Sequence, residues 1–343
     1  MQTTIRYRDR QSGFVRRVSL FLSLVAWYAP AALSLTPQAC GSYKYDPNVD
    51  MCYFDAYYPW FAAGGGWQSL LSFANPPTTG GLVSYQLMQF NPYNGTAGGP
   101  LWVKASVLGN PPIILQSVSV TAGAGQGFDV LLLDTCYSVL TCEDDQQVGQ
   151  PRNPQSGAVS VRVRASSVPA LDAQLVGQLT YLYSPAGAVP TWQTSIPLWR
   201  DSELSAEWFT TFTASPTQET RSAPGAVFNA FAIFNASDQA QTISVTISDQ
   251  SGNQIGTATT PIMPARGTAG FLLIGRVPGD ALGLWPATLS LPSNSDGLFH
   301  GFLDFKGAAG GNIVAMVNRY IGNSLSNMIV APVVGNQGTV PHP

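Results

Sequence analysis

Histidine is almost missing from this sequence, which contains two histidines among 343 residues. His342 lies in a Pro-flanked tail, and His300 is the single histidine of Leu298–Phe305, where we interpret it as a half-buried strand residue. Catalysis by histidine and zinc binding are therefore disfavoured. No HExxH, GxSxG or Walker motif occurs. The glycines at 123–127 precede no predicted helix, so we interpret them as a turn and not as a phosphate loop.

Charge is also scarce, because charged residues make up 10% of the chain and the formal net charge is −3. Of the 16 Lys and Arg residues, five lie near the N-terminus, namely Arg6, Arg8, Arg10, Arg16 and Arg17. The rest of the chain lacks the basic surface that binds nucleic acid or an anionic membrane. We therefore expect neither as a partner. Ser, Thr, Asn and Gln supply the polarity instead, which is typical of exposed strand faces.

Apolar runs as long as a bilayer is thick are absent, and the run near the N-terminus, Val18–Trp27, follows the five arginines. This run is shorter than the roughly 20 residues that span a bilayer and matches a signal peptide. We predict that 1–39 directs export by the general secretory route, with cleavage after Ala31 or Ala39. The alternative is an uncleaved anchor, which would be the only membrane contact. The expected location is secreted or in the cell envelope.

Only four cysteines occur, and an exported chain favours their pairing as disulfides. The spacing favours Cys40 with Cys52 and Cys136 with Cys142 among the three possible pairings. Each bridge would close a short loop and contribute about 2 to 3 kcal/mol.

Apolar stretches with a period of two are the main feature that is present. Val227–Asn235 is apolar almost throughout, and Ile243, Val245 and Ile247 alternate with Thr and Ser. Such stretches, separated by turns rich in Gly (34 residues) and Pro (26 residues), predict β-strands. Outside the leader no convincing amphipathic helix occurs. The fold class predicted is all-β, with antiparallel sandwiches of an Ig-like or jelly-roll-like kind.

Parts of this pattern occur twice, which predicts two tandem modules. Trp60-Phe61 matches Trp208-Phe209, and Phe73-Ala74-Asn75 matches Phe234-Asn235. We also align 174–183 with 298–305, which leaves 312–320 as an additional strand. A small charge cluster at 200–207 marks the boundary. The expected organisation is a signal peptide (1–39), an aromatic and Pro-rich N-terminal arm with Cys40–Cys52 (40–59), a first module (60–200), a second module (201–335) and a disordered tail (336–343).

Tryptophans supply the candidate ligand contacts, because aromatic rings on a sandwich face stack on sugar rings. Trp67 and Trp102 neighbour Gly-rich loops and are the candidate carbohydrate-binding residues. Trp60 and Trp208 share a repeat position, so a common packing role is expected for them first.

Carboxylates supply two further candidates. Asp134 with Glu143, Asp144 and Asp145 offers several oxygens for calcium, although a solvated acidic loop is the alternative. No other cofactor is expected. A glycoside hydrolase needs two opposed carboxylates, and the candidates in predicted ordered regions are Asp129, Asp134, Asp304, Glu203 and Glu207. The sequons at Asn94 and Asn235 would matter only in a eukaryotic secretory pathway, and Asn235 also suits a turn.

Four short segments resemble one group of proteins. They are Phe61–Trp67, Leu70–Asn75, Gly252-Asn253 and Pro264–Gly270. The chain resembles uncharacterised secreted tandem β-sandwich proteins of environmental bacteria, although the second module has Thr220–Gly225 in place of the triple glycine. The resemblance implies export and the sandwich fold, and it transfers no functional residue.

We therefore expect an exported, non-enzymatic protein with a structural or adhesive role, whose partner is a cell-surface protein, a matrix protein or a polysaccharide. The alternatives are a carbohydrate-binding protein that uses exposed tryptophans and a glycoside hydrolase with an Asp/Glu pair.

Overall fold

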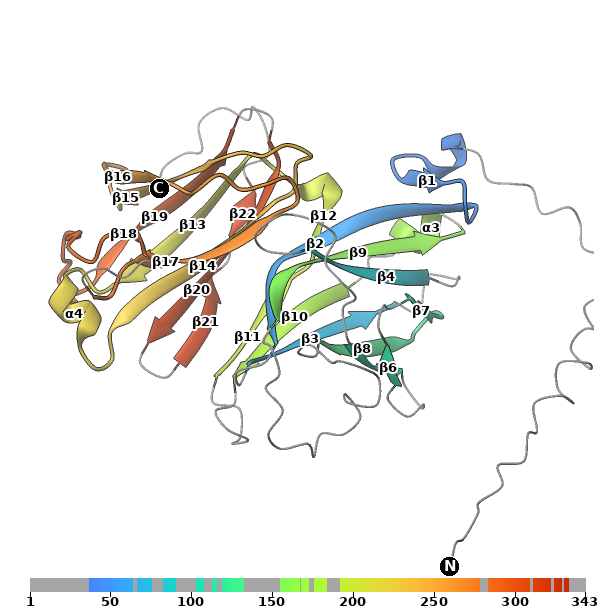
Figure 1. The fold of residues 1–343 in the computed structure, drawn as a ribbon, viewed down its shortest axis with the longest axis horizontal. Helices are drawn as coiled ribbons and strands as arrows, with labels where there is room; N and C mark the ends of the chain where they lie inside the picture. The colour runs from blue at the N-terminus through green and yellow to red at the C-terminus, as the bar shows by residue number, and fades with distance from the viewer. Residues whose placement is uncertain are drawn as a thin grey trace, which may run out of the picture.

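Short strands joined by turns make up almost all of the described chain, which confirms the all-β prediction (Figure 1). The computed structural model describes residues 37–63, 67–75, 83–90, 103–107, 113–115, 119–132, 155–166, 168–172, 176–183, 192–277, 283–308, 311–321, 324–328 and 330–332. Within these residues, short helical turns accompany the strands at η1 (Pro37–Cys40), α3 (Val168–Asp172), η4 (Asp201–Glu203) and α4 (Gln218–Ser222). None of the described helices is long and apolar enough to cross a membrane.

Two antiparallel sheets form the first sandwich. One has the order β1 (Lys44–Asp46), β2 (Met51–Ala63), β9 (Gln155–Ala165), β4 (Val83–Phe90) and β7 (Ser119–Ala122), and β12 (Trp199–Arg200) also pairs with β2. The other has the order β11 (Trp192–Pro197), β10 (Val176–Tyr183), β3 (Trp67–Ala74), β8 (Gly127–Leu132), β5 (Val103–Val107) and β6 (Ile113–Leu115).

Two further sheets form the second sandwich. One has the order β16 (Gln254–Thr259), β15 (Ile243–Asp249), β19 (Phe299–Gly307), β13 (Glu207–Ala214) and β22 (Ala331–Pro332). The other has the order β18 (Gly283–Trp285), β17 (Thr268–Ile274), β14 (Val227–Asn235), β20 (Ile313–Ile321) and β21 (Ser324–Met328). Strand β18 pairs with β17 in parallel, whereas the other ladders of these two sheets are antiparallel.

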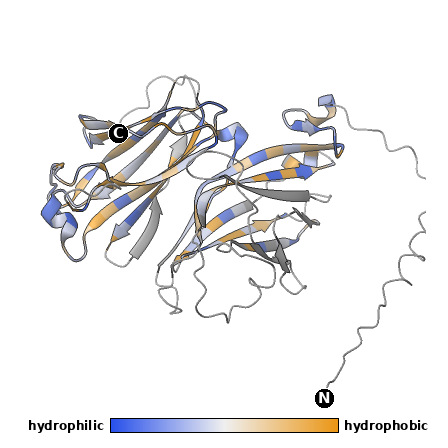
Figure 2. Ribbon diagram, viewed as in Figure 1, coloured by the Kyte–Doolittle hydropathy of each residue, from blue (hydrophilic) through white to orange (hydrophobic). Residues whose placement is uncertain are grey.

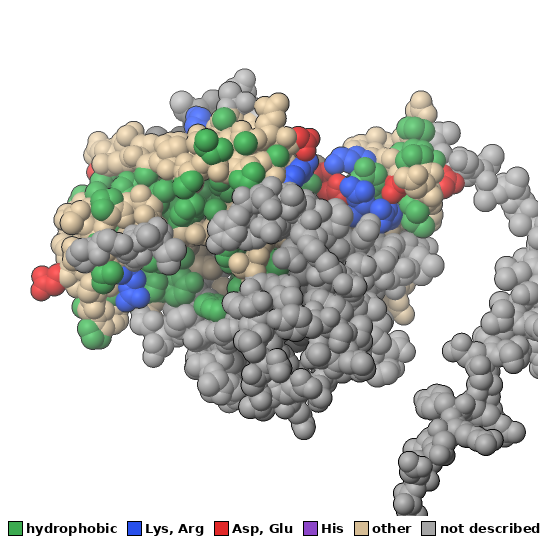
Figure 3. Space-filling view, in the orientation of Figure 1, with side chains coloured by type: hydrophobic (Ala, Val, Ile, Leu, Met, Phe, Trp, Pro, Cys, Tyr) green, Lys and Arg blue, Asp and Glu red, His purple; other side chains and the backbone are tan. Residues whose placement is uncertain are grey.

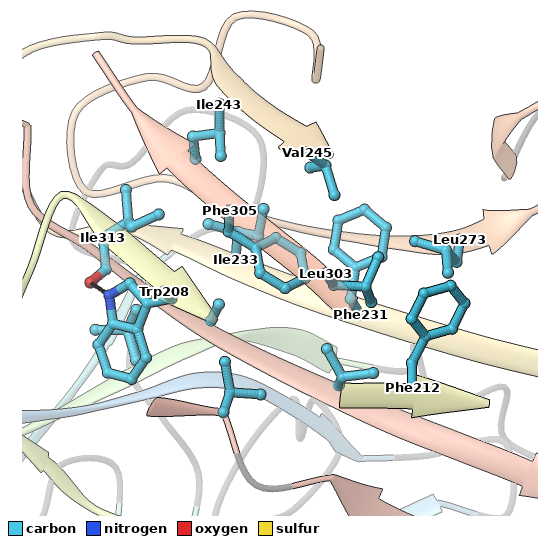
Figure 4. Close-up of a cluster of buried hydrophobic side chains, with 14 of the residues drawn as sticks. Trp208, Phe212, Phe231, Ile233, Ile243, Val245, Leu273, Leu303, Phe305 and Ile313 are labelled. Carbon is cyan, nitrogen blue, oxygen red and sulfur yellow. Dashed lines mark hydrogen bonds between the residues drawn. The ribbon is translucent and has the colours of Figure 1, made fainter. Parts of the chain in front are cut away.

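Each sandwich has its own core, because alternate residues of facing sheets point inward. Phe54, Leu71 and Val161 belong to the first core. In the second core, Phe231 packs on Phe305 with ring centroids 5.4 Å apart (Figure 4). Figure 2 shows hydrophobic and hydrophilic positions alternating along the strands of the second sandwich. This alternation is the sequence signal that predicted the strands.

The segment expected to form an N-terminal arm, 40–59, contributes strands to the first sandwich instead. Strand β2 pairs with β9 over nearly its whole length and is a long strand inside the first sandwich. Pro59, which helped to suggest an arm, lies where the pairing register shifts between Tyr58 and Phe61. A bulge tolerates proline because one residue there has no ladder bond to donate.

The predicted Cys40–Cys52 disulfide is present and buried, and it joins η1 to β2. Cys136 and Cys142 lie outside the described residues, as do 1–36 of the predicted signal peptide and the predicted tail at 336–343.

The two sandwiches place most of their strands in the same order. In the first sandwich, the sheet that contains β2 has the order β12, β2, β9, β4, β7 when it is followed from β12. In the second sandwich, the sheet that contains β13 has the matching order β22, β13, β19, β15, β16. Likewise β11, β10, β3, β8 corresponds to β21, β20, β14, β17. The expected alignment of 174–183 with 298–305 is therefore wrong by one strand. By position in the sheets, β10 corresponds to β20, and β9 corresponds to β19.

Candidate binding groove

The two sandwiches are joined by aromatic and polar contacts between β2 and the β14–β17 sheet. Tyr57 stacks on Phe234 with ring centroids 5.3 Å apart. The Thr268 hydroxyl donates to the Pro59 carbonyl at 2.5 Å, and the Arg266 guanidinium donates to the Tyr57 hydroxyl at 3.4 Å. These contacts hold the bend of β2 against the outer face of the second sandwich.

A groove of about 450 Å³ lies beside this junction. The first sandwich supplies one wall with Trp60, Trp67 and Tyr181, and the second sandwich supplies the floor from β14, β17 and β20. In the space-filling view, hydrophobic side chains gather over these three strands (Figure 3). The residues contributed by the second sandwich are Ala230, Phe231, Ala232, Gly270, Phe271, Leu272, Met316, Asn318 and Tyr320.

Small residues on the outer face of the sheet give the groove its depth. In β14, Phe231 and Ile233 belong to the core, so the alternate positions Ala230 and Ala232 face outward. Gly270 is the strand partner of Ala232, and a Cβ atom there would lie 3.6 Å from the Trp60 ring. The indole therefore lies directly over the floor, and the small side chains of the described strands leave a space beside it.

The tyrosine hydroxyl groups of the groove are neutral at physiological pH. Burial raises the pKa of Tyr320 to about 12, with a hydrogen bond from Asn318 acting in the opposite direction. Burial also raises the pKa of Tyr181 well above its ordinary value, and its hydroxyl donates to the Trp60 carbonyl. Among the described residues that line the groove, none is charged at neutral pH. The site can stack on and hydrogen-bond a ligand, and it offers no group suited to acid–base catalysis.

The structure places one predicted carbohydrate-binding residue in the groove. Trp67 is half-buried and lines it, whereas Trp102 lies outside the described residues. Trp208 is fully buried and donates its indole N–H to the Ile313 carbonyl at 2.7 Å, as its expected packing role requires (Figure 4). Trp60, its repeat counterpart, is half-buried and lines the groove instead. The packing role expected first for both tryptophans therefore fits Trp208, whereas Trp60 lines the groove.

The predicted calcium ligands lie in a part of the chain that the structure does not describe. Asp134, Glu143, Asp144 and Asp145 lie outside the described residues, and the described residues contain no cluster of three or more metal-ligating side chains.

Two of the predicted hydrolase carboxylates do lie on adjacent strands of the other sheet of the second sandwich. Phe209 of β13 is the strand partner of Asp304 of β19. The Lys306 ammonium forms an ion pair with the Glu207 carboxylate at 3.3 Å. Neither Asp304 nor Glu207 lines the groove, and Asp129 and Glu203 are exposed on other elements.

Asn235, the second sequon, is fully buried. Its amide donates to the carbonyls of Gln239, Met263 and Pro264, and its oxygen accepts from Ser237 and Gln241. The turn-forming interpretation therefore holds, and no glycan can attach to this side chain in the folded protein.

His300 is half-buried in β19, as expected. Its ring nitrogens lie 3.1 Å from the Thr213 hydroxyl and 2.7 Å from an Asp296 carboxylate oxygen. Both partners belong to the fold around it, and His300 is not among the residues that line the groove.

No family model matches the chain, and no curated protein is significantly similar to it. The resemblance to secreted tandem β-sandwich proteins stays a prediction.

Proposed function

We propose that this chain is an exported, non-enzymatic binding protein of the cell envelope or extracellular space, which attaches to a polysaccharide through the groove between its sandwiches. The observation that carries this proposal is the groove itself, which is walled by Trp60 and Trp67 and floored by alanine and glycine. Indole and phenol rings next to an open space present flat apolar faces together with polar edges. A sugar ring offers the matching apolar face and hydroxyl edge.

Export is supported by the basic and apolar N-terminal segment and by the buried Cys40–Cys52 disulfide, since disulfides persist in oxidising compartments. The matching strand orders of the two sandwiches support a tandem repeat. A structural or adhesive role fits the same geometry, because a protein that attaches to a matrix polysaccharide needs a binding face and no reaction centre. The uncharged lining of the groove gives the hydrolase alternative no support.

The test is binding of the exported chain to a glycan array, followed by titration of each bound polysaccharide. We expect Trp60→Ala and Trp67→Ala to weaken binding about tenfold or more, because buried aromatic anchors dominate binding energy. Ala230→Leu should have a similar effect by filling the floor of the groove, with both tryptophans retained.

Phe302→Ala is the matched control, because Phe302 is a half-buried aromatic residue that stacks on Phe209 far from the groove. Thermal melts of every variant separate lost binding from lost folding. The proposal is wrong if no polysaccharide binds, or if folded Trp60→Ala and Ala230→Leu bind as tightly as the natural chain.

A further inference from the structure

The open part of the groove floor is apolar and is formed by Ala230, Gly270 and Leu272. Ala230 and Leu272 are strand partners, and partners on adjacent strands project from the same face of a sheet. Gly270 lies two residues before Leu272 on β17, on the same face and about 7 Å away. Gly270 is exposed, and Ala230 and Leu272 are half-buried. Ligand atoms that rest on these three residues therefore meet no side-chain hydrogen-bonding group.

The first sandwich bounds the same space with its own apolar surface. The Trp60 ring stands over Gly270, since a Cβ atom at this glycine would lie 3.6 Å from the indole. Beside this contact, Ala232 and Met316 of the floor are buried in the hydrophobic cluster of the first sandwich. A sugar ring that enters the groove beside Trp60 has the sheet on one side and the indole on another. Apolar protein surface therefore lies next to both of its faces.

The tyrosine and amide groups beside the floor are engaged within the protein or shielded from solvent. The Tyr181 hydroxyl donates to the Trp60 carbonyl. The Asn318 amide donates to the Tyr320 hydroxyl, and its Oδ1 atom is shielded from solvent. Among the described residues that line the groove, none is charged. A hydroxyl group pressed onto the floor would lose its water without gaining a partner, which costs free energy.

Sugar rings differ in the direction in which their hydroxyl groups leave the ring. Equatorial substituents leave from the rim and keep both faces apolar, whereas an axial hydroxyl projects from one face. We propose that the groove selects an uncharged polysaccharide whose rings carry only equatorial substituents, and that Ala230, Gly270 and Leu272 determine this selectivity. A carboxylate is disfavoured because it would lose hydration without meeting a positive charge. This inference rests on the proposed function, because it names the ligand class of the same groove.

The experiment titrates the exported chain with cellohexaose and with mannohexaose of the same linkage. Their rings differ in a single hydroxyl group, which is equatorial in cellohexaose and axial in mannohexaose. We expect cellohexaose to bind about tenfold more tightly or more, because burying a hydroxyl group without a partner has a cost of that size. Cellohexaose with its primary alcohols oxidised to carboxylates keeps the equatorial geometry and adds charge. It should also bind about tenfold more weakly than cellohexaose.

Ala230→Ser places a hydroxyl group on the floor with little change in volume. It gives an axial hydroxyl a partner, so the preference for cellohexaose over mannohexaose should fall by about threefold or more. Ala240→Ser is the matched control, because Ala240 is exposed in the turn between β14 and β15 and does not line the groove. It should leave the preference unchanged. Thermal melts show whether both variants remain folded.

Equal affinity for the two hexasaccharides in the natural chain would overturn the inference and leave the proposed function intact. Tighter binding of mannohexaose or of the oxidised ligand would do the same, as would an unchanged preference in folded Ala230→Ser. A chain that binds another polysaccharide but neither hexasaccharide also contradicts the inference alone. If no polysaccharide binds, both proposals are wrong.

Discussion

Asp304 has a carboxyl group that folding moves into a half-buried position on β19. Burial and the nearby Glu207 carboxylate raise its pKa from 3.8 to about 6, with Lys306 acting in the opposite direction. One of its oxygens is shielded from solvent and has no hydrogen-bond partner. The ionised form is therefore less favourable in the folded state than in the unfolded state.

We predict that Asp304→Asn raises the stability of the protein at neutral pH. The raised pKa means that the folded state binds the proton more tightly, so stability falls as pH rises from about 4 through about 6. After allowance for solvent screening, the gain at pH 7.5 should be about 1 kcal/mol, and it should disappear below pH 4. Urea unfolding at both pH values measures it.

Asp249→Asn is the control of opposite sign. Hydrogen bonds from the Asn253 side chain and backbone, followed by one from Ser251, lower the pKa of Asp249. The Asp249 carboxylate therefore stabilises the folded state above its ordinary pKa, and this stabilisation is lost as pH falls. Asp249→Asn should destabilise the folded protein at pH 7.5. An Asp304→Asn variant that is no more stable than the natural chain at pH 7.5 contradicts the prediction.

At the scale of elements, local patterns predicted most strands correctly but not their partners. The β15–β16 hairpin was predictable because Ser251-Gly252-Asn253 is a strong turn signal, and Gly252 adopts a φ of 81° there. Strand β2 was missed because aromatic residues and Pro59 resemble an arm, and only long-range pairing with β9 makes the segment a strand. The alignment of 174–183 with 298–305 was wrong by one strand for the same reason. An alternating apolar and polar pattern fits many strands equally well, and only the long-range pairing shows which strands correspond.

Arg221 shows how a single side chain holds several elements together. It is almost fully buried in α4, and its guanidinium donates to four carbonyls on two separate segments. The acceptors are Ser215, Pro216, Ala287 and Leu289. Burial lowers the pKa of this guanidinium, and its hydrogen bonds go to carbonyl oxygens instead of a carboxylate. The side chain ties the end of β13 to the chain that follows β18.

We predict that Arg221→Met lowers the free energy of unfolding by about 3 kcal/mol or more, because three buried carbonyls and one partly buried carbonyl lose their donors while the volume stays similar. Arg221→Lys should cost less, since an ammonium restores some of the bonds. Lys306→Met is the control, because that exposed pair with Glu207 contributes about 1 kcal/mol or less. A loss below 1 kcal/mol for Arg221→Met, measured by urea unfolding, would show that water replaces the guanidinium.

At the scale of the molecule, the candidate site arises where the two sandwiches meet, which is why the sequence predicted only part of it. Trp67 was identified from the glycines beside it. Trp60 was assigned to packing, and no local pattern marked Gly270 or Tyr320 as part of a site. These residues meet in the groove only through contacts between residues about 200 apart in the chain. The alternation of Ala230 and Ala232 with larger core residues on β14 is the one local hint of an open outer face.

The contacts between the sandwiches also predict how the protein unfolds. The Tyr57–Phe234 stack and the Thr268 bond to Pro59 connect the two sandwiches, since Tyr57 of β2 belongs to the same cluster of buried hydrophobic residues as Phe234. We therefore expect a single calorimetric transition for the natural chain, with equal calorimetric and van't Hoff enthalpies. The double variant Tyr57→Ala, Thr268→Val removes the stacked ring and the hydrogen-bonding hydroxyl. We expect it to lower the free energy of interaction between the two sandwiches by about 3 to 5 kcal/mol and to split the calorimetric transition in two.

Phe302→Ala is again the matched control, because it removes a stacked ring from one sheet of the second sandwich without touching the junction. That variant should shift the transition and keep it single. Two transitions in the natural chain, or one in the double variant, would mean that the junction does not couple the sandwiches. If a polysaccharide binds in the groove as we propose, it contacts both sandwiches and should also draw the two transitions of the double variant back together.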